Sequence, residues 1–174
     1  MGPLLLNCRR VQFLHPRLAR TQLNETLEQR TTETKRGTSM IFVNAARQVL
    51  LFLRDDKPTI PYPGCWDLLG GAVEPNETPR DCIVRELKEE VPEVYVAIRH
   101  ELRDPKLYKV TRFEDRVEYT YVQQAEIPAS TPLLEGQRLQ WFSADEFRAL
   151  PAEQIAFGFR PLLMEFFETM NHAS

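Results

Sequence analysis

Two continuous apolar runs, separated by a short polar connection, mark the start of the folded region. Residues 40–43 and 49–53 are apolar throughout, and residues 44–48 join them. This pattern predicts two strands of a hairpin, and the lack of alternation indicates that both faces of each strand are covered. Further strands are predicted where β-branched residues gather or apolar and polar residues alternate, at residues 94–98, 117–125 and 139–142.

Helical periodicity is strongest after Thr78, which is suited to the N-cap, with Pro79 at the first helical position. The apolar stripe of this helix consists of Ile83, Val84, Leu87 and Val91. A capping-box pattern predicts a short helix between Ser143 and Ala149. A last helix is predicted from about residue 161 to residue 170, with a buried face made of Leu162, Leu163, Phe166 and Phe167.

Three carboxylates gather on the first of these helices. Glu86, Glu89 and Glu90 are spaced i, i+3 and i+4, so their side chains share one stripe. Like charges at this spacing repel, and a hard cation such as Mg²⁺ or Mn²⁺ removes the repulsion by sharing the oxygens. The alternative interpretation is a solvated acidic helix face without a ligand.

The wider pattern favours the metal. Gly71 is followed after five residues by Glu77, and after seven more by Arg85-Glu86-Leu87-Lys88-Glu89-Glu90. This spacing resembles the signature of the Nudix hydrolases. The chain departs from the signature at Pro92, where the family has a glycine, although proline also ends a helix. The resemblance implies an α/β (α+β) Nudix fold, a mixed β-sheet sandwiched between helices.

The resemblance also implies a reaction, the hydrolysis of a nucleoside diphosphate linked to another group, with Mg²⁺ or Mn²⁺ as the cofactor. Either Glu86 or Glu135 would accept the proton of the attacking water, while Arg85 and Glu77 would hold a glutamate in place. The loop glutamate Glu135 lies just before the strand predicted at residues 139–142. The implied metal ligands are the Gly70 carbonyl, Glu86, Glu89, Glu90 and Glu135.

A long loop follows the predicted hairpin, from Arg54 to Gly64, and proline recurs in it. Loops of this length in compact domains are more often functional than not. We take Arg54, Tyr62 and Phe157 as candidate substrate-binding residues. Trp66 either lines the same pocket or packs in the core, and we favour the core.

Three functional interpretations follow from the resemblance. The first is a hydrolase of a small nucleotide such as a (deoxy)nucleoside triphosphate, with ADP-ribose or a nucleotide sugar as alternative substrates. The second is a non-catalytic nucleotide-binding scaffold, which the retained glutamates Glu86, Glu89 and Glu90 disfavour. The third is a different chemistry on the same fold, such as isopentenyl diphosphate isomerisation. It is expected to need a nucleophilic cysteine and further metal ligands.

The composition of the chain indicates which kinds of binding partner to expect. The 174 residues carry a net charge of −3, which gives no sign of stable nucleic-acid binding. No apolar run reaches the ~18 residues that a membrane span needs. The three cysteines are an odd number without paired spacing, which favours reduced thiols and a cytoplasmic location. We expect a monomer or a homodimer that binds a small nucleotide.

The first 37 residues differ from the rest, with seven Lys or Arg against three Asp or Glu. We interpret residues 1–37 as a flexible extension and residues 38–174 as the hydrolase domain. The alternative is an Arg-rich segment that targets an organelle.

Overall fold

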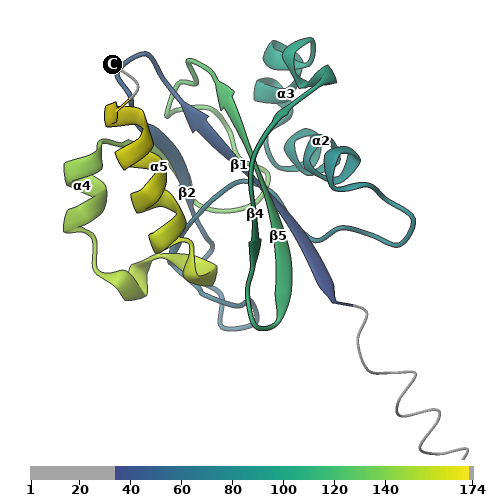
Figure 1. The fold of residues 1–174 in the computed structure, drawn as a ribbon, viewed down its shortest axis with the longest axis horizontal. Coiled ribbons are helices and arrows are strands. Elements are labelled where there is room, and N and C mark those ends of the chain that lie inside the picture. Colours follow the sequence, from purple (N-terminus) through teal and green to yellow (C-terminus); the bar gives the residue numbers. More distant parts are fainter. Residues whose placement is uncertain (1–33, 173–174) are drawn as a thin grey trace, which may run out of the picture. The chain divides into compact units, whose positions relative to one another are not determined.

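A mixed β-sheet forms the centre of the computed structural model, which describes residues 34–172 (Figure 1). The order of the paired strands is β3-β2-β1-β5-β4, and β6 also pairs with β2. β1 and β5 run parallel, whereas every other pairing within this sheet is antiparallel. The strands are β1 (Lys35–Val43), β2 (Val49–Leu53), β3 (Trp66–Asp67), β4 (Lys106–Arg112), β5 (Arg116–Gln124) and β6 (Arg138–Phe142).

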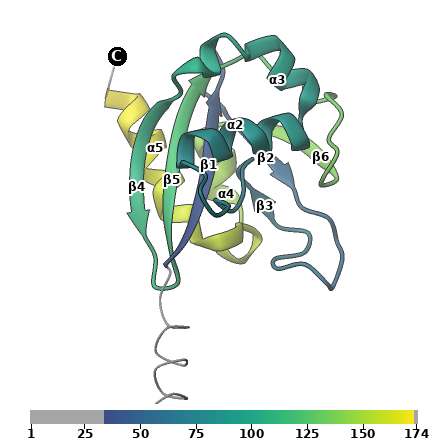
Figure 2. The ribbon, with the colours of Figure 1, turned by 90° about the vertical axis from the view of Figure 1, so that its right-hand side faces the viewer.

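Helices cover both faces of this sheet (Figures 1 and 2). One layer contains α2 (Pro79–Glu90) and α3 (Pro92–Ile98), and the other contains α4 (Ala144–Ala149) and α5 (Arg160–His172). This arrangement confirms the predicted α/β fold with a mixed sheet between helices. Short 3₁₀ turns connect the elements at Glu101–Arg103, Ala152–Gln154 and Ala156–Gly158.

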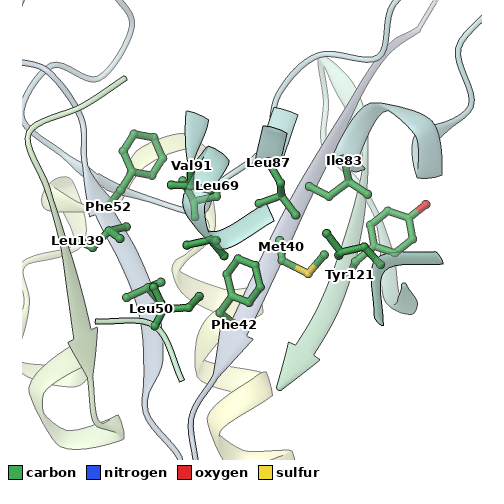
Figure 3. Close-up of a cluster of buried hydrophobic side chains, with 13 residues drawn as sticks. Met40, Phe42, Leu50, Phe52, Leu69, Ile83, Leu87, Val91, Tyr121 and Leu139 are labelled. Atoms are coloured by element: carbon green, nitrogen blue, oxygen red, sulfur yellow. The ribbon is translucent and has the colours of Figure 1, made fainter. Parts of the chain in front are cut away.

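The apolar run of β1 contributes to two cores, one on each face of the sheet. Met40 and Phe42 pack beneath α2 with Leu87 (Figure 3). Ile41, which points to the opposite face, packs with Leu163 of α5. Because neighbouring strand residues face opposite sides, a strand buried on both sides must be apolar at every position. The hairpin prediction and its two covered faces are therefore confirmed.

The segment that leads into the glycines lies beside β1. The first half of β2 pairs with β1, with Leu50 opposite Phe42. The second half of β2 pairs with β3, with Phe52 opposite Asp67. The continuation of β3 forms a bridge from Leu69 to Met40, and the Thr38 N–H donates a 2.8 Å hydrogen bond to the Gly71 carbonyl. These contacts fix the backbone of Gly70 and Gly71 alongside the first half of β1, as an extension of the sheet.

One predicted strand is wrong. Residues 94–98 form most of helix α3, not a strand. Val91 leaves helical geometry at φ −138° and ψ 64°, which ends α2, and Pro92 then starts the new helix at a position that suits its fixed φ. Val94 packs in the core under this helix. Burial therefore overrides the β preference of valine and isoleucine, which is a weak local signal.

Other local predictions are confirmed. The Thr78 hydroxyl accepts a hydrogen bond from the Asp81 N–H at the start of α2. Ser143 and Glu146 form the full capping box of α4. The four apolar residues predicted for the last helix are buried in α5. None of the helices within residues 34–172 combines the length and the apolar composition that a membrane-spanning helix requires.

β1 begins at Lys35, three residues before the start predicted for the domain, and the first 33 residues lie outside the described part of the chain. Lys35, Arg36 and Gly37 pair with the beginning of β5. We therefore expect a protein that starts at residue 38 to melt several degrees below one that starts at residue 34.

Thermal unfolding of the full chain and of both truncated proteins tests this prediction. If residues 1–33 are a flexible extension, the protein that starts at residue 34 keeps the full-length Tm. A large fall on removing residues 1–33 would contradict the predicted extension.

Candidate active site

Two glycines allow the carboxylates of α2 to approach the backbone closely. Gly70 has φ +140°, and a Cβ at this position would overlap the Thr38 carbonyl oxygen. Its N–H donates a 2.9 Å hydrogen bond to Glu90 Oε2. A Cβ on Gly71 would overlap the carboxylate of Glu86. Because neither glycine has a side chain, the carboxylates of Glu86 and Glu90 can contact the backbone of residues 70 and 71.

Arg85 is the centre of an ion-pair network on the same helix. Its Nε and Nη2 bind both oxygens of Glu77, at 2.9 and 3.0 Å. Its Nη1 contacts Glu86 at 2.8 Å and Glu89 at 3.2 Å. Nη2 also donates to the Ala72 carbonyl at 3.1 Å, which ties the helix to the glycine strand. Hydrogen bonds from Arg85 lower the pKa of Glu77 to about 2.

Negative charge accumulates where α2 ends. Burial raises the pKa of Glu90 to about 8, while the Gly70 N–H opposes this shift and the charges of Glu86 and Glu135 add to it. Burial also raises the pKa of Glu86, and the charges of Glu89 and Glu135 act in the same direction. Glu89 differs from both, because 60% of its side chain is exposed. A cation would stabilise this group of carboxylates more than water does.

Glu135 is held near these carboxylates by its loop. The neighbouring Leu134 N–H donates to the Glu90 carbonyl at 2.9 Å, and the Gln137 N–H donates to the Leu53 carbonyl at 2.8 Å. The loop therefore bridges the end of α2 and the end of β2. The charge of Glu135 adds to the raised pKa of Glu86 and of Glu90, although burial is the main cause of both shifts.

A closed metal site is not formed by these side chains. Within residues 34–172, no group of three or more His, Cys, Asp or Glu side chains has an arrangement that could hold a metal ion. The contacts of the carboxylates give the reason. Arg85 engages Glu86 and Glu89, and Glu90 is turned to the Gly70 N–H. The donor atoms are nevertheless all oxygens, which suits Mg²⁺ or Mn²⁺.

A cavity of about 320 Å³ shares a wall with this network. Its wall includes the backbone of residues 70–72, the same segment that contacts Glu86, Glu90 and Arg85. Charged and aromatic side chains form much of the remaining lining, namely Lys35, Arg36, Arg54, Asp67, Asp115, Arg116, Glu118, Phe157 and Phe159. One strip of backbone therefore lies between a group of carboxylates and a cavity of the size of small-ligand sites.

Two of the three candidate substrate-binding residues line this cavity, and the third, Tyr62, contacts one of them. Arg54 and Phe157 line it. Tyr62 is 46% exposed, and its ring centroid lies 4.6 Å from that of Phe157. Trp66 is instead buried in the core, where its ring makes an edge contact with Phe142 at 4.8 Å. This placement supports the core interpretation of Trp66.

Several charged lining residues were not anticipated from the sequence, Asp67, Arg116 and Glu118 among them. Asp67 and Glu118 are buried carboxylates, and Arg116 pairs with Glu118. The sequence signal was a charge with apolar neighbours on both sides, as in Trp66-Asp67-Leu68 and Val117-Glu118-Tyr119. That signal does not say which charges are buried, because exposed and buried charges look alike in a strand.

Comparison with known proteins identifies the family to which this arrangement belongs. A family model described as the NUDIX domain matches residues 33–165, which is most of the chain. The protein is a member of the NUDIX family. Members of this family are hydrolases of pyrophosphate bonds in nucleoside diphosphate derivatives, and they generally depend on a divalent cation.

Solved structures show the same Nudix fold. The MutT protein of Methanosarcina mazei is 19% identical, with a TM-score of 0.55, over 81% of this chain and 99% of that chain. A NUDIX hydrolase of Nitrosomonas europaea is 23% identical, with a TM-score of 0.59, over 81% and 74% of the two chains. A Deinococcus radiodurans protein, DR0079, is 17% identical with a TM-score of 0.60, over 80% and 88%.

The ion pair between Glu77 and Arg85 gives a prediction for stability. The folded pKa of Glu77 is about 2, below its ordinary value. Its contribution is therefore fully present above about pH 4.5 and is lost as the pH falls toward 2. We expect Glu77→Gln to cost roughly 1–3 kcal/mol at pH 7.

Urea unfolding of the wild type and the variant at pH 7 and at pH 3 measures this contribution. The difference between the two proteins should shrink at pH 3. The exposed Glu74→Gln is the control, because Glu74 lies in the same loop. A difference independent of pH would show that Glu77 contributes by packing and not by charge.

Proposed function

We propose that this Nudix protein is a Mg²⁺-dependent pyrophosphohydrolase of a small nucleotide, such as a (deoxy)nucleoside triphosphate. The observation that carries the proposal is the shared strip of backbone at Gly70 and Gly71. It contacts the helix carboxylates Glu86 and Glu90, and it also lines the cavity. A nucleotide that binds with its base in the cavity would reach these carboxylates if its phosphates extended past Gly70 and Gly71.

The residues at the end of α2 fit a hard divalent cation in their chemistry. Glu90 is buried with a raised pKa, so its charge is poorly stabilised in the absence of a cation. Mg²⁺, with Mn²⁺ as the alternative, would neutralise phosphate oxygens and lower the pKa of bound water. The groups that would hold it are the Gly70 carbonyl, Glu86, Glu89, Glu90 and Glu135.

The remaining residues position these groups. Arg85, fixed by both oxygens of Glu77, contacts Glu86 at 2.8 Å and sets the direction of its carboxylate. Either Glu86, one turn before the end of α2, or Glu135, whose neighbour Leu134 contacts that end, accepts the proton of the attacking water. Arg54 and Phe157, which line the cavity, bind the nucleoside part of the substrate.

The size of the cavity supports a small substrate. About 320 Å³ lies at the lower end of the range for small-molecule sites, enough for one nucleoside. A second sugar or nucleoside, as in ADP-ribose or a nucleotide sugar, would have to extend out of the cavity. These compounds are therefore the comparison substrates.

The test is the release of phosphate or pyrophosphate from nucleoside triphosphates, ADP-ribose, dinucleoside polyphosphates and nucleotide sugars, with and without Mg²⁺ or Mn²⁺. Glu89→Gln is the inactive variant, and the exposed Glu93→Gln is its matched control. Turnover of triphosphates that needs both the metal and Glu89 would support the proposal. Nucleotide binding without turnover of any compound would overturn it in favour of a binding scaffold.

A further inference from the structure

A second hollow of the surface lies between helix α2 and the segment that follows it, on one face of the sheet (Figure 2). Its volume is about 740 Å³, and it continues into a smaller hollow of about 460 Å³. The two hollows have four lining residues in common, namely Val84, Tyr95, Leu102 and Arg103. They therefore form one groove, which shares no lining residue with the cavity beside Gly70 and Gly71.

Positively charged side chains line both walls of this groove. On one wall, Arg80, Val84 and Lys88 follow one another at intervals of four residues on α2, so their side chains form one stripe. The other wall carries Arg99, the C-cap of α3, and Arg103, the last residue of the following 3₁₀ turn. We call this feature the basic groove.

These four cations have no ion-pair partner among residues 34–172. Three acids also line the basic groove, but two of them, Glu77 and Glu89, are held by Arg85. The third, Asp81, accepts a 2.6 Å hydrogen bond from the Thr78 hydroxyl. The groove therefore carries more positive charge than its own acids neutralise, although the net charge of the chain is −3.

The floor of the basic groove is apolar. Leu102 is buried there, and Val84 and Tyr95 are half-buried. A hollow with charges of one sign over an apolar floor concentrates the electric field more than a convex surface does. The arrangement therefore attracts an anion into the groove.

The spacing of the cations indicates an elongated anion. Arg80 and Lys88 are eight residues apart on α2, which corresponds to about 12 Å along the helix axis. A single phosphate cannot contact both side chains where they leave the helix, whereas several linked phosphates can follow the groove from one to the other. The guanidinium groups of Arg99 and Arg103 on the facing wall suit phosphate oxygens, which they can bind in pairs.

We infer that the basic groove is a second anion site, which binds a chain of linked phosphates. The chain comes from one of two sources. It is a free inorganic oligophosphate, or it is the far end of a nucleotide whose reacting phosphates lie at the carboxylates of α2, because Arg85 and Glu89 line the groove as well. Both sources present the same chemistry to the groove. Only the second depends on the proposed hydrolase function.

Calorimetric titration of the metal-free protein with inorganic tripolyphosphate, at low ionic strength, tests the inference without turnover. The double variant Arg99→Gln/Arg103→Gln should raise the Kd about tenfold or more, because it removes two charge-assisted contacts. The same loss is expected for Arg80→Gln/Lys88→Gln on the other wall. Orthophosphate should bind the wild type more weakly than tripolyphosphate does.

The matched control is Lys106→Gln/Arg112→Gln. It removes the same charge from two exposed positions of β4 that do not line the groove, so the Kd should change by less than about twofold. Thermal unfolding checks that each variant folds. If both groove variants fold and keep the wild-type Kd, or if the control weakens binding equally, the inference is wrong. Binding at the cavity, which also has arginines in its wall, would give the first of these results.

Kinetics with a nucleoside triphosphate and a dinucleoside tetraphosphate separates the two sources. A raised KM at unchanged kcat for the longer chain, in Arg99→Gln/Arg103→Gln, would show that the groove binds phosphates of the substrate. An unchanged KM together with weakened binding of tripolyphosphate would show that it binds a free oligophosphate. Absence of turnover for every compound would refute the proposed hydrolase, whereas the titration would still decide the anion site.

Discussion

Replacing Glu90 with glutamine is expected to lower metal-dependent kcat by about 100-fold or more without lowering the stability of the fold. Glutamine keeps the shape and one oxygen that can accept the hydrogen bond from the Gly70 N–H. It lacks the charge that a divalent cation would require. Activity and stability should therefore separate at this position.

The stability of the metal-free protein should even rise. Burial raises the folded pKa of Glu90 to about 8, well above its ordinary value. The folded state then binds more protons than the unfolded state between about pH 4.5 and pH 8, so this residue lowers stability as the pH rises through that range. Glu90→Gln removes this contribution, and its advantage over the wild type should be greater at pH 8 than at pH 5.

Turnover and chemical unfolding of Glu90→Gln, each measured at pH 5 and at pH 8, test the predicted loss of kcat and the predicted gain in stability. Glu89→Gln should lose activity to a similar extent with little change in stability, because Glu89 is largely exposed. Glu93→Gln, one residue beyond the helix junction, should change neither. If Glu90→Gln kept more than a tenth of the wild-type kcat, Glu90 would not be a metal ligand.

The parts of this molecule that were predictable from sequence are those set by local spacing. The stripe of Glu86, Glu89 and Glu90 follows from the helical repeat alone, and capping residues fixed the starts of α2 and α4. The continuous apolar runs of β1 and β2 correctly predicted that both faces of the sheet are covered. Each of these signals depends on neighbours within a few positions of the chain.

The parts that were not predictable depend on distant contacts. Asp67 and Glu118 are 51 positions apart, and they line one cavity only because β3 and β5 belong to the same sheet. Helix α3 was predicted as a strand because its valines and isoleucine favour strands, whereas packing of Val94 against the core decided its structure. The charged wall of the cavity could therefore be recognised only in the structure.

The two adjacent glycines of the site are expected to respond differently to alanine. A Cβ on Gly70 overlaps the backbone oxygen of Thr38, and Gly70 also has φ +140°, so β1 itself would have to move. We expect Gly70→Ala to cost about 3 kcal/mol or more of folding stability. A Cβ on Gly71 overlaps only the carboxylate of Glu86, the mobile end of a side chain.

Gly71→Ala should therefore fold normally and lose activity, because Glu86 is displaced from the strand and from its contact with Arg85. Urea unfolding together with kcat for both variants measures the contrast. Gly64→Ala is the control for backbone strain alone, since Gly64 has φ +64° but no neighbour closer than 3.8 Å. It should cost only about 1 kcal/mol. Full activity in a folded Gly71→Ala protein would show that the approach of Glu86 to the strand is not required for hydrolysis.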